Sequence, residues 1–246
     1  MKVATWNVNG IRARHAQFAE WAAAEQPDVI CLQELKSNVD QIPQSCQIEG
    51  YSRYWHGAGA YSGVGLHVRR SFAPEVTFTH PDFDSENRIV QTQIEDTVFT
   101  SVYVPNGGKD FDAKIAFVHA LIAYTADVHR RGLKLVLCGD MNIARAEMDV
   151  HPKERKPRAI GQLPQEREMF ETLLRQGLVD VGRALYPEDE AYFSWWAPWR
   201  NLRQRNIGWR LDYVLASEEI AQRAISCPSY REIGTSDHAP VVATFK

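Results

Sequence analysis

The sequence predicts an α/β fold in which two mixed β-sheets pack face to face and helices cover their outer faces. Residues 3–34 alternate strand, helix and strand, which is the pattern of a βαβ unit. Residues 51–104 contain short strand-like runs separated by Gly, Pro, Asp and Asn, with no helical period between them. Residues 113–245 interleave long amphipathic helices with apolar strands. Two packed sheets with helices outside bury all of these strands.

The first unit is two buried strands with a helix between them. Val3–Asn7 is a short apolar strand that ends in turn-forming residues. The spacing of apolar residues predicts a helix over His15–Gln26, which stops before Pro27 because the residue preceding a proline is disfavoured in the α region. Asp28–Leu32 is a second buried strand, and it delivers Glu34 just past its end.

The middle of the chain predicts an antiparallel meander, because no helix separates its short strands. The expected strands are Tyr51–Trp55, Val64–Val68, Glu75–Thr79, Ile89–Ile94 and Val98–Val104.

The last part returns to long helices and apolar strands. Ala113–Arg131 has the apolar period of a helix, and Pro164–Gln176 has proline at its first helical position with a glycine terminator after it. Leu133–Cys138 is a continuous apolar run typical of a buried central strand. Leu211–Leu215 and Val241–Phe245 are the late strands.

Length and composition predict one cytoplasmic domain spanning 1–246. The 246 residues contain no internal repeat and no Pro/Gly/Ser-rich linker. No apolar window approaches the ~20 residues of a membrane span, and the N-terminus does not resemble a signal peptide. The four cysteines are widely spaced, which suits a reducing compartment.

The net charge of −3 excludes a uniformly basic nucleic-acid binder, so any polyanion must meet local patches. Each patch taken alone is equally consistent with a solvated face. The basic clusters are Arg12 with Arg14; Lys153, Arg155, Lys156 and Arg158; and Arg200, Arg203, Arg205 and Arg210.

The stretch Leu137–Asn142 places two polar side chains at the end of the central strand. Asp140 and Asn142 have i, i+2 spacing, so in extended backbone they would point to the same side. The alternative is a plain turn, because Gly, Asp and Asn are turn formers.

Other strands also end on polar residues. Taken singly, each is explained by a turn, a solvated loop or, for Tyr103, a core position. Six such strand ends in one chain favour a shared site. The residues concerned are Asn7, Asn9, Glu34, Tyr103, Asp140, Asn142, Asp212, Asp237 and His238.

This set is rich in oxygen and lacks sulfur, which suits Mg²⁺ or Mn²⁺ and not zinc. His238 adjoins Asp237 and has Asp212 as a possible partner, and a carboxylate beside an imidazole fixes its tautomer and raises its pKa. A metal, an imidazole and a phenol around one point suit phosphodiester hydrolysis, which must orient water and stabilise the leaving oxygen.

Eight segments in matching order make the sequence similar to the exodeoxyribonuclease III family of apurinic/apyrimidinic (AP) endonucleases, within the endonuclease/exonuclease/phosphatase superfamily. Each is weak alone, and together they are highly specific. They are Trp6–Ala13, Cys31–Lys36, Tyr61–Gly65, Tyr103–Gly107, Gly139–Ala144, Pro164–Arg167, Gly208–Tyr213 and Ser236–Pro240.

The resemblance implies a four-layer α/β sandwich and a divalent-metal site. Glu34 would be the principal Mg²⁺ ligand, Asp140 would activate water with the help of Asn142, and Asp212 would orient His238. Tyr103 and His238 would contact the scissile phosphate. The implied catalytic set is Tyr103, Asp140, Asn142, Asp212 and His238, and the implied metal set is Asn7, Glu34, Asp140, Asn142, Asp237 and His238.

The resemblance also implies a DNA-binding surface. Trp195, Trp209 and Leu211 would wall a pocket for a flipped-out deoxyribose that lacks a base, whereas Trp196 is expected in the core. Salt-dependent phosphate contacts would come from arginines and lysines. The implied DNA-binding set is Asn9, Arg12, Asn106, Lys109, Trp195, Arg200, Trp209 and Leu211.

The expected function is Mg²⁺-dependent hydrolysis, with Mn²⁺ as a substitute, of the phosphodiester 5′ to abasic sites by a monomer acting on double-stranded DNA. Removal of nucleotides or blocking groups from 3′ ends is expected too. Asn9 and the segment Trp196–Arg200 depart from the common family pattern, which leaves the second metal position and the exonuclease preference open. Two alternatives also stay open: a phosphatase acting on a small phosphoester, and a non-catalytic DNA-binding paralogue.

Overall fold

The computed structural model describes residues 1–246 and contains two six-stranded sheets. The first sheet has the strand order β11 (Ala224–Ser226), β12 (Val241–Phe245), β1 (Lys2–Asn7), β2 (Val29–Gln33), β4 (Tyr61–Arg69) and β3 (Tyr51–Ala58). The second has the order β5 (Phe78–Thr79), β6 (Ile89–Ile94), β7 (Thr97–Tyr103), β8 (Lys134–Asp140), β10 (Asp212–Ser217) and β9 (Leu178–Asp180). The helices are α1 (Ile11–Glu25), α2 (Phe111–Arg130), α3 (Pro164–Leu174), α4 (Val181–Leu185) and α5 (Glu218–Ala221).

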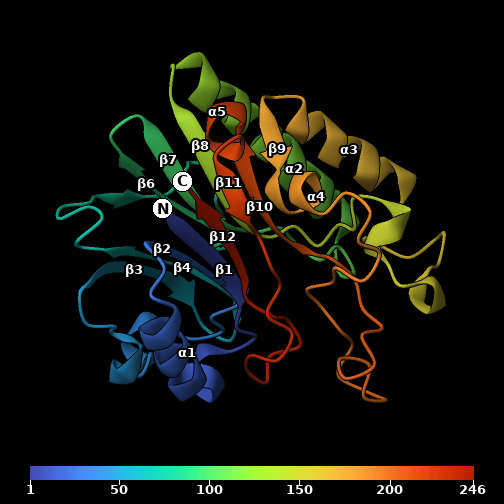
Figure 1. The fold of residues 1–246 in the computed structure, drawn as a ribbon, viewed down its shortest axis with the longest axis horizontal. Coiled ribbons are helices and arrows are strands. Elements are labelled where there is room, and N and C mark those ends of the chain that lie inside the picture. Colours follow the sequence, from blue (N-terminus) through green and yellow to red (C-terminus); the bar gives the residue numbers. More distant parts are fainter.

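The sheets form the two inner layers of a four-layer sandwich. Figure 1 shows α1 on the outer side of the first sheet, with α2 and α3 on the outer side of the second. Both sheets are mixed, since β1 and β2 run parallel and β7 and β8 run parallel, while the flanking strands are antiparallel. The predicted four-layer α/β sandwich is confirmed.

One of the two largest core clusters lies between the sheets. Side chains such as Cys31 and Leu66 from the first sheet meet Phe99 and Cys138 from the second in a cluster of 18 buried residues. A further cluster of 18 residues packs α2 and α3 onto the second sheet, and one of 13 residues packs α1 onto the first. Burial of this apolar surface fixes the facing of the two sheets and therefore the relation between their ends.

Three predictions about elements needed correction. The helix predicted from His15 begins one turn earlier at Ile11, because Gly10 takes a φ of 100° and turns the chain directly into it. The strand predicted over Glu75–Thr79 is reduced to the two residues of β5, at the edge of the second sheet. The short elements β9, β11, α4 and α5 have too few residues to show a period, and the sequence did not predict them.

None of the helices combines the length and the apolar character that a membrane crossing requires.

Candidate active site

The predicted site residues meet where the ends of the two sheets face one another. In the second sheet, Asp140 pairs with Tyr103 on β7 and with Asp212 on β10, so three polar side chains form one row across three strands. In the first sheet, Asn7 ends β1, and Glu34 follows the end of the parallel strand β2. The site is therefore assembled by strand register within each sheet and by the packing of the sheets against each other.

The chain turns immediately after Asp140. The backbone N–H of Asn142 donates to Asp140 Oδ1 at 2.8 Å, and Asn142 has a left-handed φ of 50°. Gly139 is required before this turn, because a Cβ there would lie 1.8 Å from the carbonyl oxygen of Val102. Of the two interpretations of this stretch, the turn is confirmed. The turn, and not an extended strand, brings Asn142 beside Asp140.

Asn7 links the carboxylates of the two sheets. Its Nδ2 donates to Glu34 Oε1 at 3.0 Å and to Asp140 Oδ2 at 2.9 Å, while its Oδ1 accepts the N–H of Asn9 at 3.0 Å. In this arrangement Asn7 bridges the two carboxylates through its N–H groups, and its side-chain oxygen is bonded to the backbone of Asn9. Lys36 forms an ion pair with Glu34 and donates to Asn9 Oδ1 at 2.7 Å, which fixes the outer side of the cluster.

His238 is held between two carboxylates. Its Nδ1 lies 2.8 Å from Asp212 Oδ2, and its Nε2 lies 3.8 Å from Asp140 Oδ2. The hydroxyl of Ser194 donates to the same Asp212 oxygen at 2.7 Å and accepts the backbone N–H groups of Leu211 and Asp212. The structure thus places the predicted Asp212–His238 pair in contact and adds Ser194 behind it.

Burial and neighbouring charges shift the pKa values of three groups in this cluster. Burial lowers the pKa of His238, but the charges of Asp212 and Asp140 outweigh it and raise that pKa to about 10. Burial raises the pKa of Asp140, the charge of His238 opposes it, and the charges of Asp212 and Glu34 reinforce it, which gives about 7. Burial and the same kind of negative charge raise the pKa of Tyr103 far above its usual value. At neutral pH the site therefore holds an imidazolium, a neutral phenol and a carboxyl group close to its midpoint.

The donor set fits a hard divalent cation. Ligand atoms of Glu34, Asp140 and His238 lie within 4.8 Å of one another. Asp212 Oδ1 is buried without a hydrogen-bond partner. Burial raises the pKa of Asp140, and the carboxylates of Asp212 and Glu34 beside it add to this rise. Glu34 and Asp140 are the residues placed to hold a cation. A protonated His238 would have to release its proton to join them, and its predicted place among the ligands stays a prediction.

Asp237 lies behind these groups. Its Oδ1 accepts from Asn9 Nδ2 at 2.7 Å, and its Oδ2 accepts from Trp195 Nε1 at 3.0 Å. Both oxygens already have partners, and Asp237 is not among the three residues whose ligand atoms converge. Asp237 therefore lies outside the converging ligand atoms, and its predicted place in the metal set stays a prediction.

The predicted apolar wall adjoins His238. The Trp195 and Trp209 rings meet edge to face with centroids 5.5 Å apart, and the Trp195 ring centroid lies 6.4 Å from that of His238. Leu211 packs with both tryptophans in a small cluster. Trp196 is buried in a different cluster, as predicted. The structure therefore brings an aromatic surface beside the imidazole.

Most of the predicted DNA-binding polar residues are exposed. Arg12, Asn106 and Lys109 are exposed, and Asn106 also donates to Asn142 Oδ1 at 3.2 Å. Arg200 is exposed and lines a hollow that Asn9 and other site residues also line. Their contact with DNA stays a prediction.

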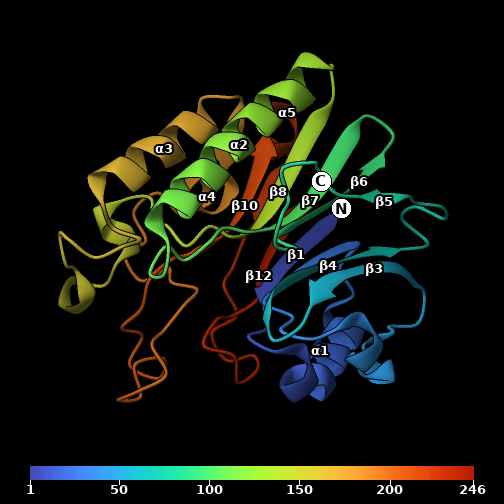
Figure 2. The same cartoon turned by 180° about the vertical axis from the view of Figure 1, so that it is seen from behind.

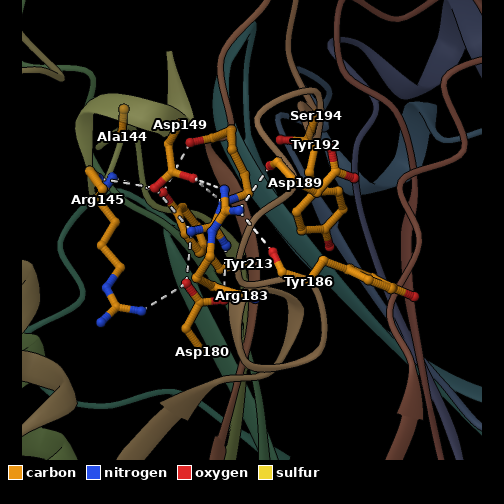
Figure 3. Close-up of polar contacts among 12 residues, drawn as sticks. Ala144, Arg145, Asp149, Asp180, Arg183, Tyr186, Asp189, Tyr192, Ser194 and Tyr213 are labelled. Carbon is orange, nitrogen blue, oxygen red and sulfur yellow. Dashed lines mark hydrogen bonds and ion pairs between the residues drawn. The ribbon is translucent and has the colours of Figure 1, made fainter. Parts of the chain in front are cut away.

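Two arginines of the predicted Arg200–Arg210 patch are structural. Arg203 donates to backbone carbonyl groups of Arg231 and Ile233, each at 2.7 Å. Arg210 is buried and contacts the carboxylates of Asp149 and Asp180 at distances of 2.7–3.0 Å. Figure 3 shows these two carboxylates with Arg145 and Arg183 beside them. The interpretation of Arg210 as part of a basic surface was wrong, because its charge is fully used inside the protein.

The sequence did not identify Lys36, Ser194 or Lys114 as supports of the site. Lys114 is fully buried, and its Nζ donates to the carbonyl oxygen of Asn142 at 2.8 Å and to Glu166 Oε1 at 2.5 Å. A signal was present, since Lys114 lies on the apolar stripe of its helix, where a lysine requires a buried partner. Lys36 and Ser194 carried no such local signal.

Known proteins similar to this chain include nucleases and a phosphatase that act on DNA. Residues 4–238 match the Endonuclease/Exonuclease/phosphatase family. The "Exodeoxyribonuclease" of Bacillus subtilis (strain 168) is 34% identical over 250 residues, which cover 98% of each chain. The structure of an AP endonuclease from Archaeoglobus fulgidus has a TM-score of 0.90 at 27% identity and covers 100% of this chain and 99% of that one. The structure of a variant of the 3′ phosphatase NExo from Neisseria, bound to a product DNA hairpin, has a TM-score of 0.91 at 33% identity with the same coverage. The chain therefore belongs to the endonuclease/exonuclease/phosphatase family, on the branch that includes the exodeoxyribonucleases and AP endonucleases.

Proposed function

We propose that this protein is a Mg²⁺-dependent DNA-repair nuclease that hydrolyses the phosphodiester 5′ to an abasic site in duplex DNA, acting as a monomer. The observation that carries the proposal is the row of Tyr103, Asp140 and Asp212, completed by His238 and bordered by Trp195 and Trp209. This row supplies the groups for phosphodiester hydrolysis, and the tryptophans supply an apolar surface directly beside them.

Asp140 is the group that takes a proton from the attacking water. Its carboxylate is held by the N–H of Asn142 on one oxygen and by Asn7 on the other, so its orientation is fixed. A base works best when its pKa lies near the working pH, and the raised pKa of Asp140 satisfies this condition. Mg²⁺, or Mn²⁺ in its place, held by Glu34 and Asp140, would supply positive charge for the phosphoryl oxygens and the leaving oxygen.

His238 and Tyr103 serve as donors to the phosphate. The raised pKa keeps His238 protonated at neutral pH, with Nδ1–H donated to Asp212 and Nε2–H directed into the site near Asp140. The raised pKa of Tyr103 keeps its phenol neutral, so it donates and does not repel the anion. Both groups stabilise charge that grows on oxygen as the phosphodiester bond breaks.

The aromatic surface would select the abasic nucleotide. A deoxyribose without a base is small and apolar enough to leave the helix and lie against Trp195, Trp209 and Leu211, whereas a normal nucleotide brings a base that must also be accommodated. Exposed Arg12, Lys109 and Arg200 would hold the phosphates on either side without regard to sequence.

Activity at 3′ ends is a second proposed function. The 33% identical Neisseria protein is described as a 3′ phosphatase, and its structure holds a product DNA hairpin. The same phosphate-binding groups would serve a terminal phosphate or nucleotide if the DNA end reached the site.

An assay on two labelled duplexes tests both functions. One duplex carries a single abasic site and the other a recessed 3′ end with or without a 3′ phosphate. Incision should require Mg²⁺, stop with EDTA and return when Mg²⁺ is added in excess. His238→Ala should lower incision by about 10²–10⁴-fold and leave duplex binding nearly unchanged, and the exposed His119→Ala provides the matched control.

The alternatives give different results in this assay. Near-wild-type incision by His238→Ala contradicts the assigned site. Turnover of inositol phosphates with no action on either duplex indicates a small-molecule phosphatase. Tight duplex binding without any hydrolysis indicates a non-catalytic DNA-binding protein.

A further inference from the structure

A second group of metal-ligating side chains lies outside the active site. His56 is in β3, at the edge of the first sheet, while His80 follows β5, at the edge of the second, and Asp84 lies in the loop between β5 and β6. Figure 2 shows β3 and β5 on the same side of the molecule. Ligand atoms of His56, His80 and Asp84 all lie within 4.8 Å of one another. Three residues from two different sheets therefore converge, and the nuclease site uses none of them.

The carboxylate of this group is already oriented toward the histidines. Asp84 Oδ1 accepts the backbone N–H groups of Arg88 at 2.9 Å and Glu86 at 3.3 Å. This leaves Oδ2, which lies 2.6 Å from His56 Nε2. A ligating carboxylate fixed by backbone amides through its other oxygen is the usual outer arrangement of a metal site in proteins.

The two imidazoles lie close enough to share an ion. Their rings stack with centroids 4.4 Å apart and an interplanar angle of 15°. His56 is partly buried, whereas His80 is exposed, so the His80 ring has room to turn its nitrogen toward the other two ligands. Bonds of about 2.0–2.2 Å in a tetrahedral site place ligand atoms roughly 3.4 Å apart. The His56–Asp84 contact would thus open by less than about 1 Å to admit an ion.

We propose that His56, His80 and Asp84 form a site for a divalent transition metal of the Zn²⁺ class, with water in the fourth position. Two imidazoles and one carboxylate prefer Zn²⁺, Co²⁺ or Ni²⁺ to Mg²⁺, which prefers an all-oxygen set. The two clusters of this protein therefore differ in the metal they select. The ion would replace the direct contact between His56 Nε2 and Asp84 Oδ2.

An ion at this place would join the edges of the two sheets. β3 and β5 are edge strands of different sheets. Near the site they are in contact through the stacked rings of Tyr54 in β3 and Phe78 in β5, whose centroids are 5.9 Å apart. An ion that binds only the folded arrangement stabilises it in proportion to its concentration. Zn²⁺ should therefore raise the melting temperature through these three residues.

Calorimetric titration of tag-free protein with Zn²⁺ tests the site. The Glu34→Gln variant serves as the background, because it removes the principal carboxylate of the other cluster. One Zn²⁺ should still bind, and adding His80→Ala should weaken its affinity by at least about tenfold, since even the loss of an outer partner costs about 10- to 100-fold. His119→Ala, which removes an exposed histidine on α2, should leave the affinity unchanged.

Two further measurements distinguish loss of the metal site from loss of the fold. Asp84→Asn should weaken Zn²⁺ binding as His80→Ala does, and circular dichroism should show both variants folded. Co²⁺ should give the intense visible absorption of a four-coordinate ion in the Glu34→Gln protein and lose it on His80→Ala. Loss of all Zn²⁺ binding in Glu34→Gln alone, or equal affinity in the His80→Ala and His119→Ala variants, would overturn the proposal. Neither result depends on nuclease activity.

Discussion

Arg210 and Asp212 lie two residues apart in the sequence but belong to two different buried clusters of charged side chains. The clusters differ in whether every carboxylate oxygen has a partner. In the Arg210 cluster, two carboxylates, Asp149 and Asp180, are met by three guanidinium groups, those of Arg145, Arg183 and Arg210. Figure 3 shows how these groups close around one another. Every oxygen of Asp149 and Asp180 has a partner within this network or in the backbone beside it.

The active-site cluster is left incomplete. Glu34, Asp140 and Asp212 share only His238 and Lys36 as cations, and Asp212 Oδ1 has no partner. Asp180 and Asp140 differ in the direction of their pKa shifts, whereas for Glu34 burial raises the pKa but His238 and Lys36 outweigh it and lower that pKa. Burial raises the pKa of Asp180, but Arg210 outweighs it and holds that pKa below its usual value, whereas the pKa of Asp140 rises to about 7. The same residue types thus form a structural cluster in which every carboxylate oxygen has a partner, and a reactive site in which one buried carboxylate oxygen has none.

The largest effects are expected when one carboxylate in each cluster is replaced by its amide. Asp140→Asn should lower incision by about 10²–10⁴-fold, because it removes the proton acceptor. It should leave the free energy of unfolding in EDTA unchanged or higher, because it relieves uncompensated charge. Asp180→Asn should instead lower that free energy by about 3–5 kcal/mol, because it leaves Arg210 unbalanced.

Incision rates and urea unfolding of both variants provide the measurement. Equal destabilisation by Asp140→Asn and Asp180→Asn would show that the active-site cluster is as balanced as the other one. The exposed Glu75→Gln gives the control for loss of a carboxylate at a distance.

Arg210→Met tests the structural cluster from its cationic side. It buries two carboxylates without their main partner, so we expect a loss of about 3–5 kcal/mol in the free energy of unfolding. Arg200→Met removes an exposed guanidinium and should change that free energy by less than about 0.5 kcal/mol. A similar effect of the two substitutions in urea unfolding would contradict the burial of charge described for Arg210.

The next smaller effect concerns the hydroxyl behind the Asp212–His238 pair. Ser194→Ala leaves two buried backbone N–H groups, those of Leu211 and Asp212, without an acceptor, which costs about 1–3 kcal/mol. It also removes a donor to Asp212, so a small change in the pKa of His238 should accompany it. Ser229 has a buried hydroxyl without a partner, and Ser229→Ala is therefore the matched control, with no loss of stability expected. Equal stability of the two variants would show that Ser194 does not hold Asp212 in place.

The last prediction concerns the pH dependence of the Asp212–His238 pair and is measured as a titration. The pKa of His238 is raised from 6.5 to about 10, so the stability it contributes is fully present below pH 6.5 and is lost as pH rises through about 10. Asp212→Asn removes the largest charge that raises this pKa, and the imidazole should titrate at a lower pH. Titration of the histidine ring protons by NMR in EDTA measures this, with exposed His119 as the internal reference. An unchanged His238 pKa in the Asp212→Asn variant would show that Asp212 does not raise that pKa.

Local sequence patterns were enough to predict the layered fold and the main residues that meet at the site. Apolar runs of period two and 3.6 define strands and helices locally, and the burial they demand leads to two packed sheets. Polar residues such as Glu34 and Asp140 stand out because they follow apolar strands at once.

The partner of each charged side chain depends on contacts between distant parts of the chain. Arg210 belongs to a basic run in the sequence, yet strand register buries it against Asp149 and Asp180, which lie 61 and 30 residues away. The convergence of His56 with His80 and Asp84 likewise depends on how the edges of two sheets meet. Pairings of this kind depend on contacts between distant strands, and local periodicity carries no information about them.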